Sequence, residues 1–263
     1  MAQEFGICIL SIIPGRKEPA DSSEQVTQLL FGEHYVVKEK RSKWIRIQCE
    51  MDEYECWIDR KQHHPISEKF GDRLNKQRFT AVSLELAGIV QNEATREITP
   101  ILMGSTLPFL KDSIFKIDKQ AYRFEGMAQT KAEKKNIDSL VQNAMVYLNA
   151  PYLWGGRQPF GIDCSGFVQL CYRMSGILLP RDAYQQATLG HALSFIEEAK
   201  PGDLAFFDNQ EGKIIHVGML LENNHIIHAS GKVRIDRIDH QGIYNNDVKD
   251  YSHRLRIIKR IID

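Results

Sequence analysis

The chain has 263 residues, of which 43% are hydrophobic and 26% charged, and its 34 basic side chains balance its 34 acidic ones. This length is too great for one small module and predicts two or three domains. A net charge of zero gives no electrostatic basis for binding nucleic acid or an anionic membrane surface, so we expect neither as a partner.

The cysteines and the N-terminus favour a reducing compartment. Five cysteines are an odd number without the spacing of a disulfide framework, although Cys49 and Cys56 could pair across neighbouring strands. The apolar run Phe5–Ile13 is like a signal peptide, but Glu4 precedes it where a basic region is needed, and Pro14 ends it. A first β-strand explains this run better. We therefore expect a cytoplasmic protein without a signal peptide or a membrane span.

The first half of the chain has the pattern of small β-barrels. Up to about residue 67, β-branched and aromatic residues form short runs, and in Trp44–Cys49 apolar residues alternate with polar ones. Residues 68–127 continue the pattern, with glycine and proline between the runs, and their length suits a second, more divergent barrel. The expected strands are Ile7–Ile13, Tyr35–Glu39, Trp44–Cys49, Glu55–Asp59, Ala81–Val90, Glu97–Met103, Thr106–Leu110 and Ile114–Ile117.

Two helices are predicted to open the second half. Residues 130–150 are charged at first and then apolar at helical spacing. After Cys164, the apolar residues of Phe167–Met174 fall three or four apart, which predicts a helix with one buried face. Asp163 can cap the free N–H groups of its first turn, and these groups and the helix dipole favour negative charge. We therefore expect a lowered pKa and a nucleophilic thiolate at Cys164.

Two later histidines can supply the base that a catalytic thiolate needs. His216 lies in an apolar strand predicted over Ile214–Leu221. His228 lies in the next strand, over Asn224–Ala229, and a tight turn between them would place the two histidines side by side. The order Cys164, His216, His228 predicts a Cys-His-polar triad, in which His216 is the general base and His228 fixes its tautomer.

Simpler interpretations of these residues stay open. Cys164 could be a small core residue, and each histidine could be held only by structural hydrogen bonds. A metal bound by Cys164, His216 and His228 is another alternative, but structural zinc sites favour close pairs such as Cys-x-x-Cys, and the sequence has none. We expect no metal and no other cofactor.

Helices followed by antiparallel strands predict an α+β domain for the second half. Asp182 would cap a short helix over residues 182–189. Beyond it, the strands expected beside the two histidine strands are Leu204–Asp208, Lys232–Ile238 and Ser252–Ile258.

Six short motifs follow one another in the second half of the chain: PYLWGG at Pro151–Gly156, DCSGFV at Asp163–Val168, LPRD at Leu179–Asp182, PGDL at Pro201–Leu204, HVG at His216–Gly218 and HA at His228–Ala229. Together and in this order, they resemble the NlpC-type cysteine peptidases, papain-like enzymes that cut cell-wall peptides. The resemblance spans roughly half of the chain.

The N-terminal part resembles the bacterial Src-homology-3-like barrel that is often fused to these peptidases. The matching segments are QLLFGE at Gln28–Glu33, WIRI at Trp44–Ile47 and YECWI at Tyr54–Ile58, with Cys56 where a glycine is usual. The resemblance therefore implies a papain-like catalytic domain over residues 128–263, preceded by two all-β barrels over residues 1–67 and 68–127.

The resemblance also implies a substrate. Relatives with two barrels cleave the γ-D-glutamyl bond to an L-diamino acid, lysine or diaminopimelate, in murein peptides with a free N-terminal L-alanine, and release L-Ala-γ-D-Glu for recycling. Tyr152 would donate to the oxyanion beside the backbone N–H of Cys164. The implied substrate contacts are Asp182, Glu33 and Tyr54 at the ammonium, Asp163 and Ser165 at the D-glutamyl part, and Trp154. Structural roles are the alternative: a helix cap for Asp182, packing for Tyr152, and ordinary surface positions for Glu33 and Tyr54.

Two other functions stay open. One is a thiol acyltransferase on the same fold, although such relatives place histidine before cysteine in the chain. The other is a catalytically idle module that binds wall fragments, against which the complete set of Cys164, His216 and His228 argues. The choice between lysine and diaminopimelate is not set by the sequence, and we expect a monomer.

Overall fold

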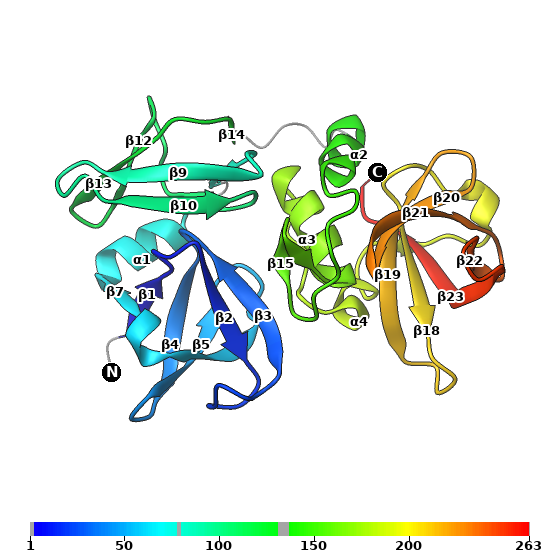
Figure 1. The fold of residues 1–263 in the computed structure, drawn as a ribbon, viewed down its shortest axis with the longest axis horizontal. Coiled ribbons are helices and arrows are strands. Elements are labelled where there is room, and N and C mark those ends of the chain that lie inside the picture. The colour runs from blue at the N-terminus through cyan, green and yellow to red at the C-terminus, as the bar shows by residue number, and fades with distance from the viewer. Residues whose placement is uncertain (1–2, 78–79, 131–136, 263) are drawn as a thin grey trace. The chain divides into compact units, whose positions relative to one another are not determined.

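The computed structural model describes residues 3–77, 80–130 and 137–262. The chain forms two compact units, one of residues 1–132 and 154–159, the other of residues 133–153 and 160–263. Figure 1 shows the strands and helices of each. In the described part of the chain, no helix is both long enough and apolar enough to cross a membrane.

A seven-stranded antiparallel sheet, in the order β3-β2-β6-β5-β4-β1-β7, begins the first unit. Alternation decides which side chains enter its core: Ile45, Ile47 and Cys49 are buried, whereas the residues between them are half-buried. Its strands are β1 (Phe5–Ile7), β2 (Ile12–Arg16), β3 (Gln25–Leu30), β4 (His34–Lys40), β5 (Trp44–Cys49), β6 (Glu55–Asp59) and β7 (His64–Ile66), with a 3-10 turn at Arg60–Gln62.

A short helix and two small sheets complete the first unit. The sheets have the orders β10-β9-β13-β12 and β11-β8-β14. Phe5 of β1 belongs to the same apolar core as Phe70, Phe115 and Phe124, so this region and the first sheet share a core. The elements are α1 (Glu68–Asn75), β8 (Ala81–Ser83), β9 (Ala87–Asn92), β10 (Ile98–Leu102), β11 (Thr106–Leu107), β12 (Ile114–Ile117), β13 (Gln120–Phe124) and β14 (Ala128–Gln129). The predicted domain boundaries at residues 67 and 127 stay predictions.

The second unit packs helices against a closed sheet. The sheet has the order β17-β23-β18-β19-β20-β21-β22, and an additional pairing of β22 with β23 closes strands β18 to β23 into a ring (Figure 1, yellow to red). Helix α3 contacts α2, α4, β19 and β20, which is why all 11 of its residues are buried and not only one face.

The bounds confirm the helix-then-strand order and the α+β class that the sequence predicted. The elements from the second helix onward are α2 (Ile137–Val146), β15 (Arg157–Gln158), β16 (Gly161–Ile162), α3 (Cys164–Met174), α4 (Ala183–Gln186), β17 (His191–Ala192), a 3-10 turn (Ile196–Glu198), β18 (Leu204–Asp208), β19 (Ile214–Leu221), β20 (His225–Ser230), β21 (Lys232–Ile238), β22 (Gly242–Asn245) and β23 (Asp250–Arg260).

Three predicted elements differ from the structure. The strand expected over Ile7–Ile13 is two strands, β1 and β2, and Pro14 lies inside β2. Proline is tolerated there because β2 pairs with β6 only at Arg16, so no backbone N–H is needed at Pro14 on the side that faces β6. The strand expected over Ala81–Val90 is also two, β8 and β9. The strand-rich pattern expected from residue 68 begins instead with helix α1, because the Ser67 side chain accepts the N–H of Phe70 as a cap.

Other predictions need smaller changes. Of the helix expected over residues 130–150, α2 ends at Val146, and the charged residues 131–136 lie outside the described part of the chain. The short helix expected over residues 182–189 covers only Ala183–Gln186. Cys49 and Cys56 are buried free thiols.

Two glycines of the second unit allow a matched test of backbone constraint. Gly190 and Gly212 have similar left-handed φ angles of +64° and +78°, but an ideal Cβ at Gly190 would lie 2.1 Å from the carbonyl oxygen of Arg260, whereas nothing lies within 4 Å at Gly212. Alanine at either position costs about 1 to 2 kcal/mol for the φ angle. We expect Gly190→Ala to lower the free energy of unfolding in urea by more than Gly212→Ala. Equal losses would show that β23 does not constrain residue 190.

Candidate active site

Cys164 is the first residue of α3, where the sequence predicted a nucleophile. Asp163 caps the helix, since its carboxylate accepts the N–H of Gly166 at 2.7 Å. Backbone N–H groups of Ser165 and Val217 donate to the Cys164 sulfur. Because Val217 directly follows His216 in β19, this contact holds the sulfur against the strand that carries the predicted base.

The surroundings of Cys164 correct one expectation about its charge. Burial and, to a smaller extent, the charge of Asp163 raise the pKa of the Cys164 thiol to about 12, although the two backbone N–H groups and Arg181 oppose the increase. The predicted lowering of this pKa is wrong, because the loss of solvent outweighs the favourable end of the helix. The thiol is therefore protonated at neutral pH and has to pass its proton to a base when it attacks.

A chain of hydrogen bonds runs from His216 through His228 to a carboxylate. His216 Nε2 lies 2.9 Å from His228 Nδ1, and His228 Nε2 lies 3.0 Å from Asp236 Oδ2. The carboxylate can only accept, so we assign the proton of His228 to Nε2 and that of His216 to its own Nε2. This assignment leaves His216 Nδ1 unprotonated and able to accept a proton. The side-by-side placement of the two histidines is confirmed.

The charges around these histidines favour a neutral imidazole at rest. Burial lowers the pKa of His216 well below its ordinary value, and the neighbouring His253 and His228 lower it further. Burial alone would raise the pKa of Asp236, but hydrogen bonds from His228 and Arg234 hold it below its ordinary value. Asp236 is therefore ionised and supplies the negative charge that would stabilise a protonated histidine pair.

Asp236 was not among the residues predicted from the sequence, although a local signal for it exists. Strand β21 pairs with β20 so that Asp236 lies opposite Ile226, which places it on the same face as His228. The tight turn at Gly231 and the alternation within Lys232–Ile238 were enough to predict this register.

His253 was also not predicted as a site residue, and the sequence around it gives no local signal. Its ring lies over His216 with a centroid separation of 4.1 Å and an interplanar angle of 25°. The contact arises because β23 pairs with both β18 and β22, and the chain order does not predict that closure.

The histidine cluster invites comparison with a metal site. Ring nitrogens of His216, His228 and His253 lie within 4.8 Å of one another. However, both ring nitrogens of His228 are already used in the hydrogen-bond chain. The rings of His216 and His253 are stacked, so the lone pairs of their nitrogens lie in two nearly parallel planes. Tetrahedral zinc needs lone pairs that converge on one point. The arrangement fits proton transfer better than metal binding.

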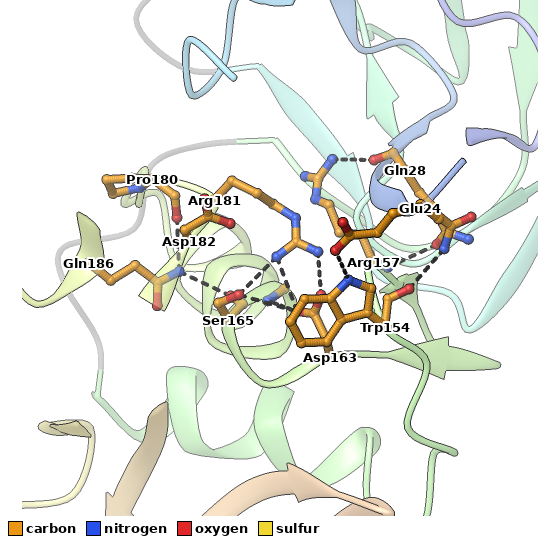
Figure 2. A network of polar contacts seen from close by, with 12 residues as sticks. Glu24, Gln28, Trp154, Arg157, Asp163, Ser165, Pro180, Arg181, Asp182 and Gln186 are labelled. Carbon is orange, nitrogen blue, oxygen red and sulfur yellow. Dashed lines mark hydrogen bonds and ion pairs between the residues drawn. The ribbon is translucent and has the colours of Figure 1, made fainter. Parts of the chain in front are cut away.

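Of the other predicted site residues of the second unit, Tyr152, Asp163 and Ser165 lie near Cys164. Tyr152 pairs with Ile162, two residues before Cys164, and its pKa is raised by burial, with smaller contributions from Cys164 and Asp163. Arg181 is buried and donates to Asp163 at 3.1 Å and to Ser165 at 2.9 Å (Figure 2). Asp182 is half-buried at the start of α4, where its backbone N–H donates to the Gln185 side chain at 3.2 Å.

The remaining predicted residues, Glu33, Tyr54 and Trp154, belong to the first unit. Glu33 is buried, and its two carboxylate oxygens accept from the Arg157 guanidinium at 2.8 and 3.0 Å. The Trp154 indole donates to Glu24 at 2.7 Å (Figure 2), and Tyr54 is half-buried. Roles of these three residues toward a substrate stay predictions.

Comparisons with known proteins agree with the two kinds of domain. Residues 149–251 match the NlpC/P60 family, and residues 15–62 match the bacterial dipeptidyl-peptidase Sh3 domain. A gamma-D-glutamyl-L-lysine dipeptidyl-peptidase of Bacillus subtilis (strain 168) is 27% identical over an alignment of 218 residues that covers 77% of this chain and 71% of that protein. Dipeptidyl-peptidase 6 of Lysinibacillus sphaericus is 24% identical over 253 residues, covering 88% and 91%.

A solved structure supports the fold. The crystal structure of an NlpC/P60 family protein from Bacillus cereus ATCC 10987 superposes with a TM-score of 0.82 at 20% identity, covering 98% of this chain and 100% of that one. The predicted plan of a papain-like domain after Src-homology-3-like β-structure is therefore confirmed.

Alkylation distinguishes a reactive Cys164 from an inert core thiol. We expect iodoacetamide to label Cys164 stoichiometrically near neutral pH, because His216 can accept the thiol proton, and we expect His216→Ala to slow labelling by about 100-fold. Cys171 provides the control: it is fully buried on the same helix, so Cys171→Ala should leave the rate unchanged. Mass spectrometry of the labelled peptides gives both rates. Equal labelling of the wild type and His216→Ala would exclude His216 as the base.

Proposed function

Because the chain belongs to the NlpC/P60 family of cysteine peptidases, which act on peptidoglycan, we propose that it hydrolyses the γ-D-glutamyl bond to an L-diamino acid in murein peptides with a free N-terminal L-alanine. The observation that carries this proposal is the hydrogen-bond chain from Asp236 through His228 to His216, beside the strand contact that holds the Cys164 sulfur. The choice of bond is supported by the Bacillus subtilis relative, which is named a gamma-D-glutamyl-L-lysine dipeptidyl-peptidase.

The first half of the reaction forms a thioester. The Cys164 sulfur attacks the carbonyl carbon of the γ-glutamyl bond as its proton passes to His216 Nδ1. The oxyanion accepts hydrogen bonds from the backbone N–H of Cys164, which has no partner within the helix because it is the first helical residue, and from the Tyr152 hydroxyl. His216 then gives its proton to the leaving amine of the diamino acid, and the C–N bond breaks.

The second half releases the dipeptide. Water gives a proton to His216 and attacks the thioester, and the proton returns to the Cys164 sulfur as the C–S bond breaks. In both halves His216 is transiently an imidazolium, and the bond to His228, backed by the Asp236 carboxylate, stabilises this charge in a buried site. The buried thiol and imidazole are neutral before and after each turnover, so no isolated charge remains in the core.

The requirement for a free amine is part of the proposal. In the second unit, the Asp182 carboxylate would pair with the L-alanine ammonium, and Asp163 and Ser165, both held by Arg181, would contact the D-glutamyl part. An intact cell wall has its L-alanine in an amide bond and offers no ammonium, so we place cleavage after wall breakdown. Recycling of murein peptides in the cytoplasm belongs to the same proposal, with lysine or diaminopimelate as the diamino acid.

A pair of substrates tests this requirement. We expect L-Ala-γ-D-Glu-L-Lys to be hydrolysed with a kcat/KM about 10 to 100 times that of its N-acetylated form, since a hydrogen bond to a charged group contributes about 1.5 to 3 kcal/mol. Asp182→Asn keeps a good helix cap while removing the charge, and should reduce this preference mainly by slowing the free-amine substrate. Chromatography of the released L-Ala-γ-D-Glu measures each rate. Equal hydrolysis of both substrates would remove the free-amine proposal and leave the peptidase activity intact.

A further inference from the structure

His253 lies on β23, two residues beyond the segment that matches the NlpC/P60 family, and contacts the catalytic histidines. Its ring stacks on His216, with centroids 4.1 Å apart. The same ring is edge-on to His228 at 5.7 Å and to Phe207 at 5.9 Å. His216 is therefore held by a hydrogen bond at one edge and covered by an aromatic ring over one face.

The position of His253 is itself well defined. The Ser252 hydroxyl forms a hydrogen bond with its Nδ1 at 2.9 Å, and its backbone pairs with Ile243 of β22. An ideal Cβ at residue 242 would lie 1.8 Å from the carbonyl oxygen of His253, so β22 approaches this closely only because residue 242 is glycine. These contacts fix both the backbone and the ring of His253.

A stacked ring adds a constraint that the hydrogen bond lacks. The bond from His216 Nε2 to His228 fixes one atom of the imidazole but still permits rotation of the ring about the line of that bond. Rotation would swing the in-plane lone pair of Nδ1 out of line with the sulfur, although the Nδ1 atom itself would move little. A ring packed against the face opposes this rotation, and small misplacements of a reacting group cost large factors in rate.

We propose that His253 is a positioning residue for the cysteine peptidase reaction: its ring packs on His216 and holds His216 Nδ1 toward the Cys164 sulfur. The inference rests on the proposed function, because it assigns His253 to the same reaction, but part of its test needs no substrate.

The charges of the cluster agree with this role. Burial and, to a smaller extent, the charge of His228 lower the pKa of His253 to about 4, and Asp236 opposes the change. His253 is thus neutral when His216 carries the proton, and the stack brings no second positive charge against the imidazolium. Among the described residues, the charged groups that act on His216 and His253 include His228 of β20 and Asp236 of β21, which is paired with Arg234. The Cys164 thiol of α3 is held beside β19 by its contact with Val217.

Two substitutions at residue 253 distinguish stacking of an aromatic ring on His216 from simple filling of the space beside it. His253→Phe keeps an aromatic face, and His253→Leu keeps a similar volume without one. His240→Leu, at an exposed position in the turn between β21 and β22, is the control for histidine removal. Urea unfolding establishes that each variant is folded.

We expect His253→Leu to lower kcat on the dipeptide-releasing substrate by about 10 to 100-fold with KM nearly unchanged, and to slow alkylation of Cys164 by a similar factor. His253→Phe should restore most of both rates, and His240→Leu should match the wild type. The proposal is overturned if folded His253→Leu keeps wild-type alkylation and kcat, or if the Phe variant is as slow as the Leu variant. Because alkylation uses no peptide, a wrong substrate assignment would leave that result standing.

Discussion

The hydrogen bond between His216 and His228 is the interaction on which the proposed active site depends. Burial disfavours charge on both the Cys164 thiol and the His216 imidazole, so neither group is activated by itself. The bond fixes the proton of His216 on Nε2, leaves Nδ1 as the acceptor, and connects the imidazole to the ionised Asp236. In the proposed reaction, reactivity therefore comes from a directed proton acceptor and not from a resting thiolate.

The closed sheet explains why residues distant in the chain meet at this bond. His216, His228 and Asp236 come from three consecutive strands, and closure through β22 and β23 adds His253. Glycine makes the close approach possible: an ideal Cβ at Gly218 would lie 2.8 Å from the Cβ of His228. The missing side chain at Gly218 leaves room for the imidazole of His228.

The parts of the site that follow local patterns could be predicted from the sequence. The helix after Cys164 follows from apolar spacing and a capping aspartate, and the histidine hairpin follows from two apolar strands around a turn. Strands Leu204–Asp208, Ile214–Leu221 and Lys232–Ile238 have the bounds expected for them.

The predictions that failed concern features that depend on tertiary contacts. The direction of the Cys164 pKa could not be predicted, because the end of a helix is visible in the sequence whereas the depth of burial is not. His253 was missed because β23 reaches His216 and His228 only through closure of the sheet. Helix α1 was missed for a different reason: Phe70 and Leu74 have helical spacing after the Ser67 cap, but the surrounding strand pattern was extended across them.

The most direct test of the account is to identify the atom that carries the acyl group during turnover. Protein mixed with L-Ala-γ-D-Glu-L-Lys and quenched in acid would be digested and examined by mass spectrometry, with Cys164→Ala and Cys171→Ala in parallel. The account predicts an L-Ala-γ-D-Glu adduct on the peptide that contains Cys164, retained in Cys171→Ala, and no turnover in Cys164→Ala. Hydrolysis by Cys164→Ala at the wild-type rate would contradict it.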